Sequence, residues 1–192
     1  TLDQKYEGNI HYTSVDIKYL NQSELSFQQR KTKDFLYYPF DPTRTENGTP
    51  LPANRYYDYT QYVISYRSPS RNLFNTRSNI SYGSFYNGTK FSIQNNLSFR
   101  KQPIFNVSLR LNYDSIKLPD PYPSRDIWLI TPKFEFTFTK KTFWTTYIQF
   151  SSQSENLGIN SRLQWRFAPL SDLYLVYNDN YFTKNSITPQ LR

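Results

Sequence analysis

The sequence predicts an all-β fold: an antiparallel up-and-down transmembrane β-barrel with about ten strands in this chain, as part of a larger barrel. The pattern is clearest in residues 104–113, where apolar and polar side chains alternate. A period of two indicates a strand with one apolar and one polar face. In an outer-membrane barrel the apolar face meets lipid and the polar face lines the lumen. The alternating side chains are Phe105, Val107, Leu109, Leu111 and Tyr113 against Asn106, Ser108, Arg110 and Asn112.

Composition supports the membrane interpretation over a soluble core. The chain has 192 residues, enough for one domain, but only 37% of them are apolar. Its apolar surface is built largely from rings, with 18 Tyr and 15 Phe, which suits the aromatic girdles of a barrel. No run of about 18 apolar residues occurs, so no transmembrane helix is expected.

Several classes of function are excluded by residue counts. There is no cysteine, which excludes a disulfide scaffold, thiolate metal sites and a cysteine nucleophile. The net charge is +8, but the basic residues are scattered along the chain and form no stripe, so nucleic acid is not an expected partner.

In the first half of the chain, turn-forming residues separate the alternating segments. Residues 34–54 form a loop with four prolines, which cannot sit in a hydrogen-bonded ladder. Asn87-Gly88 is a strong signal for a tight hairpin. The predicted strands are residues 8–20, 24–33, 55–67, 73–86 and 89–100, with short turns at 21–23 and 68–70.

In the second half, turns and loops again separate the alternating segments. A turn at 101–103 leads into residues 104–113, and a second proline-rich loop covers 117–124. Lys140-Lys141 is a tight turn, 153–156 is a polar loop and 169–172 is a turn. The further predicted strands are 125–138, 142–151, 157–167 and 173–178, and residues 180–192 are less patterned.

The connections alternate in length. Short turns alternate with connections that include both proline-rich loops, so one set of strand ends would face the periplasm and the other the outside. Asn87-Gly88 is the exception, a short connection on the long-loop side. The three tryptophans also fall near strand ends, as an interfacial belt requires. The predicted membrane-interface aromatics are Trp128, Trp144 and Trp165.

The two faces of the strands predict two sets of side chains. The set expected to face hydrocarbon is Phe105, Leu109, Leu111, Ile130, Phe134, Phe136, Ile148 and Leu163. The charged set expected to face the lumen is Asp16, Lys18, Arg30, Arg77, Arg100, Arg110, Asp114, Lys133, Glu135, Arg162 and Arg166. Basic side chains dominate this set, so an open lumen would favour anions, whereas in a plugged lumen the charges only pair with each other.

Two runs of sequence resemble a family of bacterial outer-membrane proteins known by the domain DUF5916. They are residues 79–89 (NISYGSFYNGT) and residues 158–178 (GINSRLQWRFAPLSDLYLVYN). The resemblance implies a C-terminal barrel that follows a carbohydrate-binding family 9-like domain. It carries over no catalytic residues. Here it implies that residues 1–192 are a single transmembrane β-barrel region, the C-terminal portion of a longer protein.

No catalytic, cofactor or metal site is predicted. The single histidine, His11, lies on a strand, and one histidine cannot make a zinc site. Asp16, Asp114 and Glu135 are candidates for a pair of catalytic acids, as in glycosidases. The alternative is that they neutralise basic side chains on neighbouring strands.

The function expected from the sequence is an integral protein of the bacterial outer membrane, acting as a scaffold or pore. Expected partners are the lipid bilayer, other outer-membrane proteins and glycans. A soluble all-β binding module and a barrel-embedded hydrolase are the alternatives. The chain is not expected to close a barrel alone, since its last residues give no aromatic-ended strand. A ladder between residues near Ile10 and residues near Leu173 would contradict this.

Overall fold

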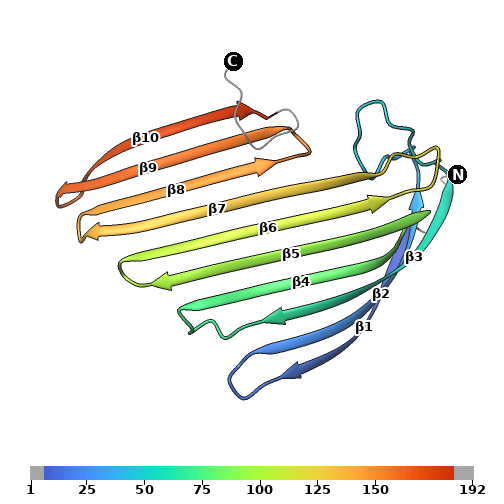
Figure 1. Ribbon diagram of the computed structural model, residues 1–192, viewed down its shortest axis with the longest axis horizontal. Coiled ribbons are helices and arrows are strands. Elements are labelled where there is room, and N and C mark those ends of the chain that lie inside the picture. The colour runs from blue at the N-terminus through green and yellow to red at the C-terminus, as the bar shows by residue number, and fades with distance from the viewer. Residues whose placement is uncertain (1–6, 184–192) are drawn as a thin grey trace, which may run out of the picture. The chain divides into compact units, whose positions relative to one another are not determined.

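The computed structural model describes residues 7–183, which form one ten-stranded antiparallel sheet. The strand order is the order of the chain, so each strand pairs with the strands before and after it (Figure 1). Residues 7–183 contain no helix, and thus none that is long and apolar enough to cross a membrane. The strands are β1 (Gly8–Lys18), β2 (Glu24–Leu36), β3 (Arg55–Arg67), β4 (Phe74–Phe85), β5 (Gly88–Lys101), β6 (Phe105–Lys117), β7 (Arg125–Thr139), β8 (Thr142–Ser151), β9 (Asn156–Ala168) and β10 (Ser171–Phe182).

This architecture confirms the prediction of an all-β, antiparallel, up-and-down fold of about ten strands. The predicted strands 55–67 and 142–151 have the observed bounds of β3 and β8. Both proline-rich loops follow even-numbered strands, as predicted, and β4 and β5 are joined by two residues. The six-residue connection 68–73 is longer than the short turn predicted at 68–70.

Five predicted strand ends are wrong by two residues or more: those observed at Lys18, Leu36 and Lys117, and both ends of β10. Cross-strand pairing explains the error at the end of β10. β10 continues to Phe182 although its own alternation fades, because β9 supplies a complete ladder that runs to the pair Phe182↔Asn156. β2 likewise runs to Leu36. The β4–β5 turn is Tyr86-Asn87, with Gly88 already in β5. Tyr86 has a φ of 51°, the left-handed conformation that tight hairpin turns require.

The described chain divides into two compact units. The first, here called the loop-bearing unit, comprises described residues from 7–66, 79–93 and 114–126. The second, here called the C-terminal unit, comprises described residues from 67–78, 94–113 and 127–183.

The loop-bearing unit has a small apolar core beneath its long loop. Leu51 in that loop is fully buried, and a backbone bridge pairs it with Phe40. The Tyr86 ring lies 5.3 Å from the Tyr57 ring and 5.9 Å from the Phe40 ring. The buried apolar side chains of residues 7–183 all belong to this unit: Phe35, Leu51, Tyr57, Ile116 and Leu118.

The two proline-rich loops of this unit contact each other. A Cβ added at Gly48 would lie 3.0 Å from Cγ of Pro123, so only glycine fits there without displacement. The Arg125 guanidinium donates to the Arg44 carbonyl at 2.9 Å. The 18-residue connection 37–54 is therefore packed and hydrogen-bonded.

The C-terminal unit is built differently, because no buried apolar side chain of residues 7–183 lies in it. Its apolar residues stand side by side on one face of the sheet. Phe136 pairs with Trp144, Trp144 pairs with Leu163, and Leu163 pairs with Leu175. Leu175 is 71% exposed. No second layer of the described chain covers this row.

β1 and β10 are the first and last strands of the sheet order. Within residues 7–183, the ladder of β1 is with β2 and the ladder of β10 is with β9. The ladder between Ile10 and Leu173 that would contradict the closure prediction is not present there. That further strands complete the wall stays a prediction. The C-terminal residues that suggested it, residues 187–192, lie outside the described part of the chain.

We predict that Leu51→Ala destabilises the protein by about 2–5 kcal/mol, since it leaves a cavity in a closely packed site. The measurement is the free energy of unfolding of the detergent-refolded protein in urea. Leu20→Ala is the matched control, because Leu20 lies fully exposed in a turn and should change stability by less than about 0.5 kcal/mol. Equal effects of the two substitutions would contradict the conclusion that Leu51 is packed in a core beneath the long loop.

A second prediction concerns Asp41, in the long loop. Burial raises the pKa of its carboxyl, but hydrogen bonds from the Thr43 hydroxyl and from backbone N–H groups of Thr43, Thr45 and Arg44 outweigh it and hold the pKa below 3.8. Because the pKa of Asp41 is lower in the folded than in the unfolded protein, the ionised carboxylate stabilises the loop at any pH above the unfolded-state pKa. This stabilisation is lost as the pH falls through the folded-state pKa. Amide exchange at Thr43 and Thr45, corrected for intrinsic rates, should accelerate below about pH 4.

Asp41→Asn is the control for this prediction. The amide cannot be deprotonated, so protection of Thr43 and Thr45 should be weaker near neutral pH and should lose its dependence on acid. The same acid-dependent loss of protection in both proteins would show that another group controls the loop.

Candidate functional site

Polar side chains of neighbouring strands are hydrogen-bonded across one face of the C-terminal unit. Ser98 of β5 donates to Asn75 of β4 at 2.7 Å. Arg110 of β6 donates from Nε to Asn96 of β5 at 3.1 Å. Asn106 of β6 donates to Glu135 of β7 at 2.6 Å. Because a side-chain bond between strands requires both groups on one side of the sheet, β4 to β7 share a continuous polar face.

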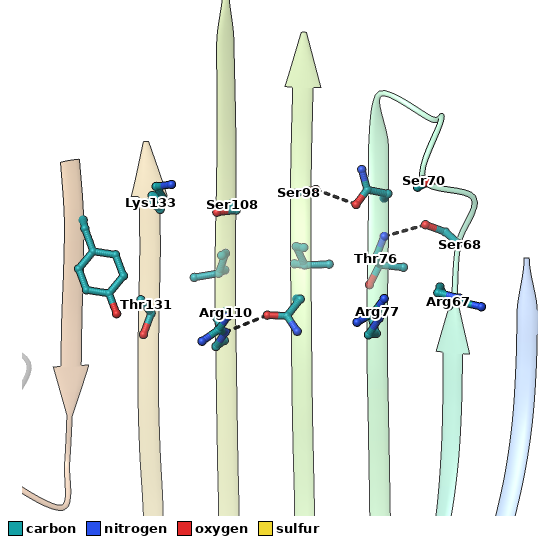
Figure 2. A pocket seen from close by; sticks show the side chains of 15 residues that line it. Arg67, Ser68, Ser70, Thr76, Arg77, Ser98, Ser108, Arg110, Thr131 and Lys133 are labelled. Carbon is teal, nitrogen blue, oxygen red and sulfur yellow. Dashed lines mark hydrogen bonds between the residues drawn. The ribbon is translucent and has the colours of Figure 1, made fainter. Parts of the chain in front are cut away.

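This polar face holds a hollow of about 450 Å³ (Figure 2). Four basic side chains line it, and no carboxylate does. Arg67, Arg77 and Arg110 lie at one level across β3, β4 and β6 in Figure 2. The other polar lining residues are Ser68, Ser70, Asn75, Asn96, Ser98, Ser108, Thr131, Lys133 and Tyr147, while Thr76, Leu97 and Leu109 alternate with them along the strands.

Lys133, one of the basic residues that line the hollow, has an acidic partner. Its Nζ lies 2.7 Å from Oε1 of Glu135, two residues along the same strand. Asn106 donates to the other carboxylate oxygen, so both oxygens of Glu135 are engaged. Glu135 therefore neutralises part of the local positive charge from just outside the hollow.

The remaining basic residues of the predicted lumen set in this unit lie outside the hollow. Arg100 donates to the Ser70 carbonyl at 2.6 Å. Arg162 lies 5.7 Å from the centre of the Tyr174 ring. Arg166 is paired with Asp172 at 3.2 Å. The structure therefore gathers Arg77, Arg110 and Lys133 but not these three.

The other predicted lumen residues belong to the loop-bearing unit. Asp114 forms an ion pair with Lys90 at 3.0 Å. Arg30 donates to Gln61, whose side chain is 2% exposed. Asp16 and Lys18 stand on β1 opposite Ser26 and Glu24.

The three tryptophans lie near strand ends of the C-terminal unit. Trp144 and Trp165 lie at one end of the β8–β9 ladder, where Thr142 pairs with Trp165. Trp128 lies at the other end, where its carbonyl accepts a hydrogen bond from the Ser152 N–H at 3.0 Å. Trp144 stacks on Phe136 at 5.4 Å and donates from Nε1 to Ser161 at 2.9 Å, so its polar atom is satisfied within the apolar face.

The candidate acids and histidine form no catalytic constellation in the described residues. Asp114 pairs with Lys90 of the neighbouring strand β5, as the charge-neutralisation alternative expects, whereas Glu135 pairs with Lys133 of its own strand. His11 lies on β1 with Asn9 Nδ2 3.0 Å from its Nε2. Within residues 7–183, no group of three His, Cys, Asp or Glu side chains is placed to hold a metal ion.

Sequence reasoning missed Arg67 and Lys90. Arg67 ends β3, where the apolar positions Tyr62, Ile64 and Tyr66 alternate with it, so the period of two contained the signal. Lys90 could not be matched to Asp114 without the register of β5 against β6.

Comparison with known proteins finds one similarity to a solved structure, at low sequence identity. No family model and no curated protein matches the chain. The chain is similar to a structure titled "KdgM porin in complex with disordered oligogalacturonate", with a TM-score of 0.36 and 14% identity over 90% of this chain and 85% of that chain. The function proposed below rests on the side chains of this protein.

Proposed function

We propose that this chain forms part of the wall of a β-barrel in the bacterial outer membrane and acts there as a scaffold or pore. The observation that carries the proposal is the uncovered apolar face of the C-terminal unit. A soluble sheet buries its apolar face against a second layer. Here Trp144, Leu163 and Leu175 form a row that no described segment covers. Hydrocarbon is the environment that such a face fits.

Strand length and tryptophan placement support the same environment. Each strand has 10–15 residues, whereas strands of soluble proteins average about 5–6. A membrane-spanning strand needs about 9–11 residues. Ser152, which pairs with Trp128, lies eight residues beyond Trp144, or about 27 Å along the strand at about 3.4 Å per residue. Barrels carry an apolar band about 25 Å tall between their aromatic girdles.

The polar face supports an anion-favouring lumen. The predicted lumen set has eight basic and three acidic side chains, and the hollow adds Arg67 to the basic ones. Hydroxyl and amide groups between the arginines suit solutes with many hydroxyls, so the proposal includes uptake of glycan-related solutes. It also includes membership in the DUF5916 family, and other outer-membrane proteins as partners.

The proposal is tested first by an arginine placed on the apolar face. Leu109→Arg should destabilise the membrane-inserted protein by about 2–4 kcal/mol and reduce the fraction that resists carbonate extraction, because a charge would enter hydrocarbon. Ser108→Arg is the matched control, since it puts the same side chain on the polar face. Equal stability and extraction of the two variants, or soluble native protein, would contradict the membrane wall and favour a soluble binding module.

Charge selectivity provides a separate prediction. In planar bilayers under a salt gradient, the reversal potential should indicate anion preference, because basic side chains dominate the predicted lumen face. Glu135→Gln should strengthen that preference by removing the partner of Lys133. Cation preference would contradict the electropositive lumen, and inserted protein without conductance would favour a scaffold over a pore.

A further inference from the structure

We propose that the hollow around Arg77 and Arg110 is a binding subsite for an acidic carbohydrate, meaning a saccharide that carries carboxylate, sulfate or phosphate groups. This inference rests on the proposed function, because it gives the lumen face of the wall a ligand. The charge of the lining is the first argument. Arg67, Arg77, Arg110 and Lys133 line the hollow without a carboxylate among them, so an anion placed there meets no like charge in the lining.

The placement of two arginines is the second argument. Arg77 and Arg110 stand at one level on β4 and β6 (Figure 2). Asn96 belongs to β5, the strand that lies between these two in the sheet. Two strand spacings separate their backbones by about 10 Å, within the combined reach of two arginine side chains. Asn96 accepts the Nε–H of Arg110 at 3.1 Å, which orients that guanidinium. Guanidinium groups donate in pairs to carboxylate or phosphate oxygens.

The neutral lining identifies the rest of the ligand. Ser108, Thr131 and Asn75 offer hydroxyl and amide groups close to the arginines. Groups of this kind exchange hydrogen bonds with sugar hydroxyls. Tyr147 adds a ring that is 38% exposed and can pack against a sugar ring. The volume of about 450 Å³ lies within the range of small-molecule sites, about 300–1,000 Å³. An inorganic anion would engage the guanidinium groups and leave this neutral surface unused.

The test is binding to the full-length protein refolded in detergent, measured by isothermal titration calorimetry. The probes are a hexuronate trisaccharide, a sulfated and a phosphorylated disaccharide, a neutral glucose trisaccharide, and inorganic phosphate. At least one acidic saccharide should bind at least tenfold more tightly than the neutral trisaccharide and inorganic phosphate. The preferred acidic probe identifies the anionic group.

The arginines are tested by the double variant Arg77→Gln/Arg110→Gln, which should weaken the preferred acidic saccharide at least tenfold and leave the neutral one unchanged. Arg77→Lys/Arg110→Lys keeps the charge but removes the paired donors, so it should recover only part of the affinity. Lys140→Gln/Lys141→Gln is the control, because it removes two charges at a turn outside the hollow and should change affinity less than twofold.

The outcomes separate this inference from the proposed function. Equal binding of acidic and neutral trisaccharides, equal binding of inorganic phosphate, or equal losses in the glutamine and turn variants would overturn the carbohydrate subsite and leave the membrane wall standing. Failure of the parent protein to insert in membranes, with acidic saccharide still bound through Arg77 and Arg110, would overturn the wall and leave the subsite standing.

Discussion

The backbone hydrogen-bond ladder is the interaction on which the rest of this structure depends. Within residues 7–183, ten consecutive strands pair only with their sequence neighbours, so one layer of sheet satisfies the N–H and C=O groups between strands without help from a second layer. The core of a bilayer contains no water that could hydrogen-bond to unpaired backbone groups, so a membrane-spanning sheet must pair these groups itself. The ladders between neighbouring strands meet that requirement. The same one-layer construction provides no second sheet, within the described residues, against which the apolar side chains could pack.

The two units meet this constraint in different ways. In the loop-bearing unit, the connection 37–54 folds back and supplies Leu51 to a small core, so part of the apolar surface is buried by the protein itself. In the C-terminal unit, rows such as Phe136, Trp144 and Leu163 have no covering layer in the described chain. Even there, Trp144 donates its indole N–H to Ser161, which removes an unsatisfied polar atom from an apolar surface.

The local charge on the polar face depends on ion pairs between side chains as well as on the number of basic residues. Asp114 is matched to Lys90, Glu135 to Lys133, and Arg166 to Asp172. These pairs reduce the local excess of positive charge at three places. The lining of the hollow itself contains three arginines and Lys133 but no carboxylate, so an external anion meets no like charge among the lining residues.

The sequence by itself determined the fold class, the number of strands and most of their bounds. Alternation in residues 104–113, the two proline-rich loops and the Lys140-Lys141 turn are local signals, and a strand with period two has its faces assigned as soon as one position is known. It also predicted Arg77 and Arg110 on the polar faces of their strands, although Arg67 and Lys90 were missed. It did not extend β10 to Phe182, since those residues are held by the ladder of β9.

Only the tertiary structure decided which of those residues meet. Arg77 and Arg110 are 33 positions apart, and their common level depends on the registers of β4, β5 and β6, which hydrogen bonds between strands set. The same holds for Lys90 with Asp114 and for the burial of Leu51. A local pattern specifies the direction of a side chain from its own strand, but a site of several strands requires the offset between them, and that offset is a property of the assembled sheet.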